Sequence, residues 1–223
     1  METAKAFFDF MGSLFCHQLS SRTLKADNLL LPVCSRDTGI YTGIFVSLLF
    51  LVLFRRMKAQ KTPSIPLTVT MCILMLPMVL DGILSYSGLT QTTNVIRLFT
   101  GVMFGIPIPL FLVPAANFDI HGRNELGPVE AWWEPIMIYG AAFSICILLI
   151  CEAVPYMIAS MIIMIGFLSL LFRLFYVINA QAFRLKKLPL YMASFGGMLF
   201  MLAAMYALSA YILKPIRTAL TGG

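Results

Sequence analysis

Charged residues are scarce in this chain. Only 12% of its 223 residues are Asp, Glu, Lys or Arg, against 60% hydrophobic residues, whereas a soluble domain averages about 25% charged residues. The composition therefore excludes an ordinary soluble domain. The alternating ten-residue segments of an outer-membrane barrel are also missing, and no basic face carries the interleaved aromatic residues that nucleic-acid binding needs. The first residues lack a basic stretch and a small-residue cleavage site, so we expect no cleavable signal peptide.

Six apolar runs approach the length of about 20 residues that a helix needs to cross a bilayer. They predict an all-α polytopic transmembrane helix bundle with about six spans. A further stretch, residues 3–16, is too short to span and has one broad apolar side. It is either an N-terminal interfacial amphipathic helix on the outer leaflet or a short helix packed on the bundle. The predicted spans are 39–54, 66–86, 95–114, 135–153, 155–177 and 189–213, and Pro107, Pro109 and Pro114 should bend or break the third.

The chain divides by this pattern into three parts. Residues 1–38 form an external interfacial helix and a Cys/His segment, residues 39–114 a three-helix core, and residues 115–223 three further transmembrane helices. Basic clusters predict the orientation, because cytoplasmic loops are rich in Lys and Arg. We expect a plasma-membrane protein with both termini external. The clusters are Arg55, Arg56, Lys58 and Lys61 after the first span and Arg184, Lys186 and Lys187 after the fifth; Lys5, Arg22, Lys25 and Arg36 weaken the bias.

Polar residues gather at the external ends of the second and third spans. Ionisable groups inside a membrane are costly and commonly face a bundle interior or a functional cavity. Asp81 lies near the end of the second span, and Asn94 and Arg97 share one face at the start of the third. We expect an Asp81–Arg97 ion pair, either as a structural clamp or as part of a catalytic site that includes Asn94. Gly101 and Gly105 form a small-xxx-small step that lets another helix approach closely.

The segment FCHQLSSRTLKADNLLLPVCSRDTGIYTG holds the most reactive side chains. Cys16, His17, Cys34 and Asp37 suit a metal site, and zinc accepts all three residue types. A Cys16–Cys34 disulfide is an alternative that would contribute roughly 3 kcal/mol. A reactive thiol is another, because a helix N-terminus and Arg36 would both lower the pKa of Cys34. The remaining cysteines, Cys72, Cys146 and Cys151, are expected to serve packing.

Four motifs in order, CHQ, LPVCSRDTGIYTG, LDG and TNVIRLFTG, resemble an uncharacterised prokaryotic integral-membrane family, a domain of unknown function. The resemblance covers about residues 14–105 and implies no established activity. Many relatives have a second Cys where this chain has Asp37, an exchange that keeps a metal ligand but loses a disulfide partner, so the resemblance favours metal. The matching residues are Cys16, His17, Gln18, Cys34, Arg36, Gly39, Tyr41, Asp81, Gly82, Asn94, Arg97, Thr100 and Gly101.

These observations lead to a functional hypothesis. An external zinc site would activate a water molecule, and Arg97 would hold an anionic group such as a lipid phosphate. The reaction would be hydrolysis of a lipid or another membrane-embedded substrate. An accessory subunit of a membrane complex, bound to membrane-protein partners and holding a disulfide or structural metal, is an alternative. A transporter is a third, although the inner halves of the spans are nearly free of ionisable groups.

Overall fold

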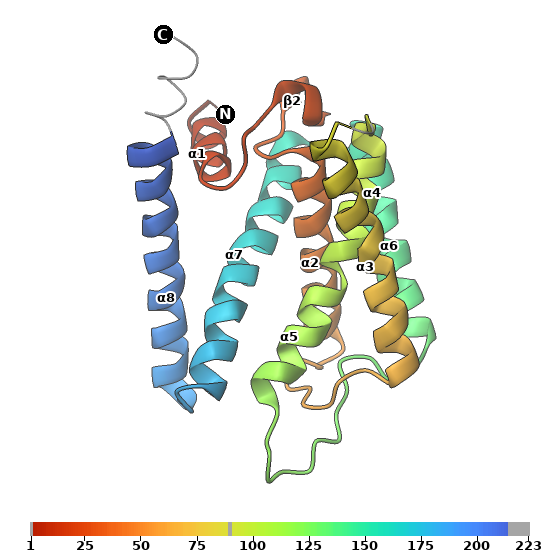
Figure 1. Ribbon diagram of the computed structural model, residues 1–223, viewed down its shortest axis with the longest axis vertical. Helices are drawn as coiled ribbons and strands as arrows, with labels where there is room; N and C mark the ends of the chain where they lie inside the picture. The colour runs from red at the N-terminus through yellow and green to blue at the C-terminus, as the bar shows by residue number, and fades with distance from the viewer. Residues whose placement is uncertain (1, 89–90, 214–223) are drawn as a thin grey trace.

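A computed structural model describes residues 2–88 and 91–213 of the chain. Six of its helices are long and apolar enough to cross a membrane, which confirms the predicted helical bundle (Figure 1). The last ten residues, which include the predicted external C-terminus, lie outside the described residues. The elements are α1 (Glu2–Ser13), the 3-10 turn η1 (Ser20–Arg22), β1 (Lys25–Ala26), β2 (Leu29–Leu30), α2 (Ser35–Leu53), α3 (Ile65–Tyr86), α4 (Asn94–Gly105), α5 (Pro107–Asn117), α6 (Trp133–Ile150), α7 (Tyr156–Gln181), α8 (Lys187–Leu208) and the π-helical turn η2 (Ser209–Leu213).

Local chemistry explains the observed form of the first and third spans. The first span begins at Ser35, four residues earlier than predicted, because the polar turn after Cys34 is helical and Asp37 is favourable near the positive helix N-terminus. The third span is broken at Ile106 into α4 and α5, as the prolines predicted. Pro107 lacks the N–H that would continue the helix ladder. The two pieces still form one candidate crossing of 24 residues.

Helix α2 lies at the centre of the bundle, with α4 directly against it. Their backbones approach at glycines, as the small-xxx-small step predicted. A Cβ atom added to Gly101 would lie 2.3 Å from the Arg36 carbonyl oxygen, and one added to Gly105 would lie 2.1 Å from that of Ile40. Apolar side chains gain little by leaving lipid for another helix, so close backbone packing of this kind is what holds membrane helices together.

The approach is reciprocal and extends to a third helix. On α2, a Cβ atom at Gly39 would lie 2.1 Å from the Leu98 carbonyl oxygen, and Gly43 faces α4 one turn further on. On the other side of α2, Gly166 of α7 meets the backbone of Tyr41, with a Cβ-to-oxygen distance of 2.2 Å. Helix α2 is therefore clamped between α4 and α7.

The segment before α2 forms a lid over one end of the bundle, which we define as residues 14–34. A two-stranded hairpin, β1 paired antiparallel with β2, lies within it. Its turn residues Asp27 and Asn28 both have positive φ, as tight two-residue hairpins require. The Asp27 carboxylate accepts a 2.8 Å hydrogen bond from the N–H of Tyr156, which attaches the turn to the start of α7.

Helix α1 shows features of both interpretations offered for residues 3–16. Phe8 is buried and packs edge-to-face on Tyr156 of α7, so the helix is docked on the bundle. Phe7 and Phe10 on its other side remain 55% and 49% exposed, as an interfacial helix would require. In Figure 1, α1 lies at the lid end, above α7 and beside the end of α8.

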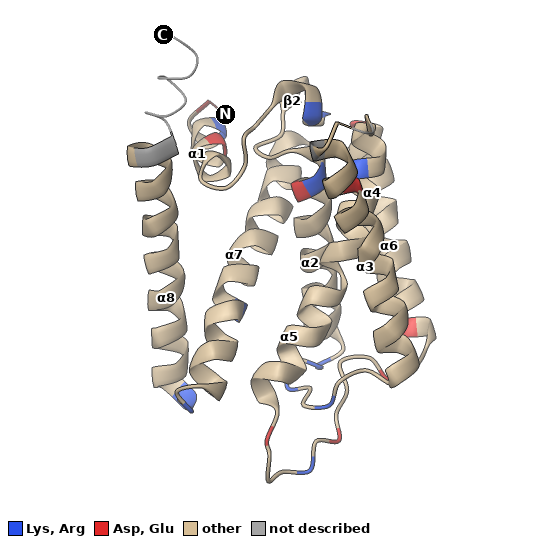
Figure 2. Ribbon diagram, in the orientation of Figure 1, with Lys and Arg blue, Asp and Glu red and all other residues tan. Residues whose placement is uncertain are grey.

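Charged residues gather at the two ends of the bundle, and the middle is largely apolar (Figure 2). At the end opposite the lid, Arg56 forms a 3.0 Å ion pair with Glu130 and a 3.4 Å pair with buried Glu134. The Glu134 carboxylate also accepts a 2.7 Å hydrogen bond from the N–H of Glu130. This network holds the loop before α6 against the end of α2.

Gly101→Ala should strongly destabilise the protein, because its new methyl group would overlap the backbone of α2. We expect a loss of about 1–3 kcal/mol or more, measured as thermal unfolding in detergent. Gly140→Ala in α6 is the matched control, since no atom lies within 4 Å of its added Cβ. Equal melting temperatures for the two variants would contradict the proposed role of the α2–α4 contact.

Candidate metal site

Cys34 and Asp37 are brought together by the first turn of α2. Cys34 is the N-cap residue, with extended backbone angles, and Asp37 lies three residues later in the first turn. The N-cap and third helical side chains converge in such a turn. The Cys34 thiol donates a 3.3 Å hydrogen bond to Oδ2 of Asp37. This part of the site is built by local structure alone.

Cys16 reaches the same place from the lid. The preceding residue, Phe15, stacks on Phe167 of α7 with ring centroids 3.9 Å apart and packs edge-on against Tyr41 of α2. The Gln18 side chain donates hydrogen bonds of 2.8 Å to the Asp9 carbonyl and 2.9 Å to that of Pro32, which closes the lid on itself. These contacts hold Cys16 beside the N-terminus of α2.

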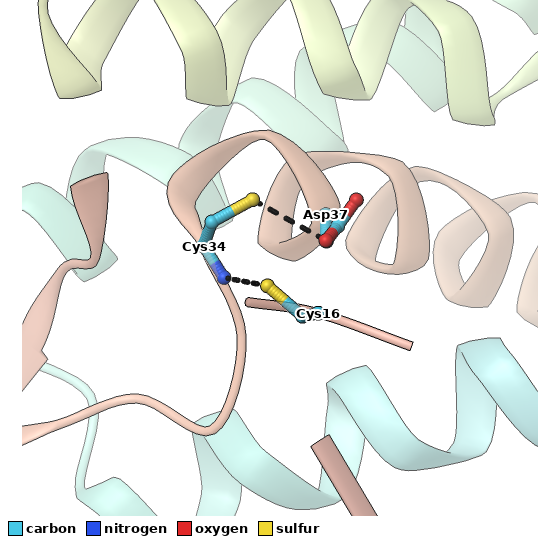
Figure 3. Close-up of side chains that lie close together, drawn as sticks. All are labelled: Cys16, Cys34 and Asp37. Atoms are coloured by element: carbon cyan, nitrogen blue, oxygen red, sulfur yellow. Dashed lines mark hydrogen bonds between the residues drawn. The ribbon is translucent and has the colours of Figure 1, made fainter. Parts of the chain in front are cut away.

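The three side chains form a compact group (Figure 3). Both cysteines are free thiols, and the N–H of Cys34 donates a 3.2 Å hydrogen bond to Sγ of Cys16. One ligand atom each from Cys16, Cys34 and Asp37 lies within 4.8 Å of the others. Donor atoms on one tetrahedral zinc ion stand roughly 3.5–3.8 Å apart. The donor set therefore fits a zinc ion with small side-chain adjustments.

The two thiols have opposite acidities. The neighbouring Cys34 thiol lowers the pKa of Cys16, and the hydrogen bond from the Cys34 N–H acts in the same direction, although burial opposes this shift. The proximity of Cys16 raises the pKa of Cys34, and burial and the negative charge of Asp37 raise it further. Cys16 is therefore the first of the pair to become a thiolate, the form that binds metals and attacks electrophiles.

His17 is not part of this group. Its side chain is exposed, and the metal-ligand cluster comprises only Cys16, Cys34 and Asp37. Adjacent side chains point in different directions from one backbone, and the packing of Phe15 and the contact with Cys34 turn Cys16 inward. The structure thus brings together three of the four predicted ligands and leaves His17 at the surface.

The predicted Asp81–Arg97 ion pair is wrong. Buried Asp81 of α3 pairs with Arg36 of α2, whose Nε donates a 3.1 Å hydrogen bond to Oδ2. Arg97 is buried as well, but its guanidinium donates to the hydroxyls of Thr92 at 3.0 Å and Ser85 at 3.2 Å. Ser85 lies one turn beyond Asp81, so Arg97 extends past the carboxylate while Arg36 reaches it from the neighbouring helix.

Arg97 lies among several charged groups. Within the described residues it forms no ion pair, but Arg22, Arg36 and the carboxylate of Asp81 lie within electrostatic range of it. Among the same residues, the buried Oδ1 atom of Asp81 has no hydrogen-bond partner. Arg36 is also close to a second carboxylate, that of Asp37. Three arginines therefore lie near two carboxylates at the lid end, and the remaining positive charge suits an additional anion.

Asn94, one of the predicted catalytic residues, makes a structural contact. Its side-chain amide donates a 3.3 Å hydrogen bond to the Ser21 carbonyl oxygen in η1, so it attaches the lid to the start of α4. Thr100 bonds back to the carbonyl of Ile96 in its own helix. Asn94 therefore lies beside the candidate site without pointing into the cysteine cluster.

One membrane-embedded cation was missed by sequence reasoning. Arg173 lies in α7, in the run SLLFRLFYV, where a single charged residue interrupts apolar neighbours. That interruption is the signal that identifies it, and Arg173 is an exception to the near absence of ionisable groups from the inner halves of the spans. Asp27 was missed too, because only the folded chain brings the hairpin turn to α7.

The fold and site together define a polytopic helical membrane protein with a Cys/Cys/Asp cluster at one end of the bundle. Residues 16–111 match the family model described as predicted membrane protein (DUF2085). The chain is 30% identical over 102 residues to an uncharacterized protein of Methanocaldococcus jannaschii, a match covering 46% of this chain and 64% of that relative. It is 30% identical over 106 residues to an uncharacterized protein of Methanothermobacter thermautotrophicus, covering 48% of this chain and 91% of that relative.

The chain therefore belongs to the DUF2085 family, which confirms the resemblance drawn from the motifs. It spans just under two thirds of the length of the first relative and most of the second. No solved structure matches it. The family segment contains the cysteine cluster, the Arg36–Asp81 pair and the α2–α4 contact, whereas α6, α7 and α8 lie beyond it.

The opposite pKa shifts of the two thiols predict that Cys16 is alkylated at a lower pH than Cys34. In metal-free protein, Cys16 should react with iodoacetamide at lower pH than an ordinary cysteine, because its pKa is lowered, and Cys34 only at much higher pH, because its pKa is raised. Peptide mass spectrometry after labelling at a series of pH values measures both. In Cys34→Ala, Cys16 should need a higher pH, because the neighbouring thiol is lost while the backbone N–H hydrogen bond remains. Earlier labelling of Cys34 than of Cys16 would contradict the described order of acidities.

Proposed function

We propose that this protein binds one zinc ion through Cys16, Cys34 and Asp37 and uses it to hydrolyse an anionic, membrane-embedded substrate. The observation that carries the proposal is the convergence of these three donors, within 4.8 Å of one another, from two separate segments. Structural zinc sites usually have four protein ligands, whereas catalytic sites have three and keep one position for water. Three donors at the membrane interface favour the second kind.

Arg97 supplies the second part of the proposal. A buried guanidinium bonded only to hydroxyls in the described region can take a negatively charged group at little cost, because no carboxylate has to be displaced. Arg22 and Arg36 add positive charge around it. Zinc, when bound, would lower the pKa of its water so that hydroxide is available near neutral pH. The substrate class is an anionic lipid or a similar amphiphile held by its phosphate or carboxylate.

A structural zinc site is the second candidate, favoured by the position of the ligands. Cys16 belongs to the lid and Cys34 to the start of α2, so an ion between them would fasten the lid to the bundle. This function suits an accessory subunit of a membrane complex. In that case zinc removal would loosen the lid without changing any reaction.

Zinc binding by variants distinguishes the proposed ligands from neighbouring residues that do not bind the ion. Purified wild-type protein should carry about one zinc ion per chain, and Cys34→Ala and Asp37→Ala should each lower the affinity at least tenfold, measured by competition with a chromogenic chelator. His17→Ala is the matched control and should retain the wild-type affinity, because its side chain is outside the cluster. Failure of the wild-type protein to bind zinc would refute both candidate functions.

The same proteins distinguish catalysis from structure. Proteoliposomes of phosphatidylglycerol and phosphatidylethanolamine, analysed by mass spectrometry for released head groups and lysolipids, should show zinc-dependent turnover in the wild type and none in Cys34→Ala. Arg97→Gln should raise KM more than it lowers kcat if it holds the anionic group. Full zinc occupancy without turnover, together with a lower melting temperature on chelation, would support the structural site instead.

We infer further that the lid end of the bundle is external. The loops between α2 and α3 and between α7 and α8 carry most of the basic residues at the opposite end, and such loops favour the cytoplasm. Alkaline phosphatase fused after Gly223 should be active in a bacterial host, because it folds only outside the cytoplasm, and a fusion placed after Gln60 should be inactive. The reverse pattern would place the metal cluster on the cytoplasmic face.

A further inference from the structure

A second cationic site lies at the end of the bundle opposite the lid. Arg173 is 17 residues along α7 from Tyr156, a distance of about 26 Å at a rise of 1.5 Å per residue. It is therefore close to the other membrane surface and far from Cys16, Cys34 and Asp37. Charged residues at such depth are usually paired or line a functional cavity.

Arg173 has no acidic partner within residues 2–88 and 91–213. Its Nη2 atom lies 3.8 Å from Sδ of Met57, and its guanidinium carbon lies 5.4 Å from the centre of the Tyr176 ring. A thioether is a weak acceptor, and a tyrosine face offers only a modest attraction to a cation. Neither neutralises the charge, so the guanidinium retains capacity for an anion.

A groove of about 510 Å³ adjoins this cation. It is lined by side chains of α2, α7 and α8, apolar except for Ser169 and Arg173, and none of its lining residues is acidic. Its volume lies within the range of about 300–1,000 Å³ that small-molecule sites occupy. Several of its walls face outward, with Leu49, Val52 and Phe195 each between 44% and 55% exposed. The groove therefore opens sideways toward the hydrocarbon.

Two tyrosines lie within electrostatic range of Arg173, although neither lines the groove itself. The Tyr176 ring lies 5.5 Å from that of Tyr191 on α8, centre to centre. Tyrosines are enriched at the level of lipid head groups, where their rings are apolar and their hydroxyls can bind polar groups. Arg173 and these phenols together provide a positive charge and hydrogen-bond donors at one end of an apolar channel.

We propose that this groove holds one phospholipid with an anionic head group, from the leaflet on the side of the α7–α8 loop. Its phosphate binds Arg173 and one acyl chain lies along the wall formed by Val52, Leu168 and Phe195. Charge complementarity selects the head group, and the apolar, laterally open walls select an amphiphile over a soluble anion. The site does not depend on the proposed zinc chemistry. Its cation, Arg173, lies outside the segment that matches the family model, whereas its α2 wall lies inside that segment.

Native mass spectrometry of protein released from nanodiscs tests the proposal. The nanodiscs would contain equal amounts of phosphatidylglycerol and phosphatidylcholine with identical acyl chains. Wild-type protein should retain one phosphatidylglycerol in preference to phosphatidylcholine. Arg173→Gln should reduce that preference about tenfold, the effect expected from losing one charge-assisted hydrogen bond, whereas Arg173→Lys should keep part of it.

Two further variants keep the test decisive. Arg184→Gln removes a nearby cation that lines a different pocket, and it should leave the preference unchanged. Val52→Trp fills the groove from an exposed position and should reduce retention of both lipids. If Arg184→Gln lowered the preference for phosphatidylglycerol as much as Arg173→Gln, the lipid would be attracted only by the general positive charge of this end of the bundle, and the proposal would be overturned. Unchanged lipid retention in Arg173→Gln or in Val52→Trp would overturn it as well. Size-exclusion profiles and melting temperatures establish that each variant is folded.

Discussion

The close contact between α2 and α4 is the constraint on which the rest of the structure depends. Gly101 and Gly105 admit the carbonyl oxygens of α2, and Gly39 and Gly43 admit those of α4. Such packing allows almost no sliding of one helix along the other, because each glycine faces one particular carbonyl. It fixes the depth of Cys34, Arg36 and Asp37 at the start of α2 relative to Arg97 in α4. The position of the site in the membrane follows from this register.

The lid completes a site that the bundle alone leaves unfinished. The first turn of α2 supplies Cys34 and Asp37, but Cys16 arrives from a segment held by aromatic stacking and by bonds to backbone carbonyls. Asp27 and Asn94 fasten this segment to α7 and α4. Helix α7 supports the lid from beyond the family segment, because Phe167 stacks on Phe15 and the N–H of Tyr156 bonds to Asp27.

The three membrane-embedded arginines Arg36, Arg97 and Arg173 have three different kinds of partner. Arg36 is neutralised by a buried carboxylate, Arg97 is solvated by two hydroxyls, and Arg173 contacts a thioether and an aromatic face. A charged side chain inside a membrane is unfavourable unless an interaction with another group stabilises it. The decreasing number of anionic partners along this series is the physical reason for proposing anion binding at Arg97 and Arg173, whereas Arg36 is already paired with Asp81.

The helical class, the six crossings, the break before Pro107 and the close approach at Gly101 and Gly105 are all predictable from the amino-acid sequence. These features depend on apolar run length, missing N–H groups and side-chain size, all of which are local. The convergence of Cys34 and Asp37 is local as well, because their spacing matches one helical turn. In contrast, the folded chain was needed to show that Cys16 joins them while His17 stays exposed, that Asp81 pairs with Arg36, and that Arg173 borders a groove. Those outcomes depend on how side chains from different helices compete for the same partner. The spacing of residues along the sequence does not reveal which side chain makes the contact.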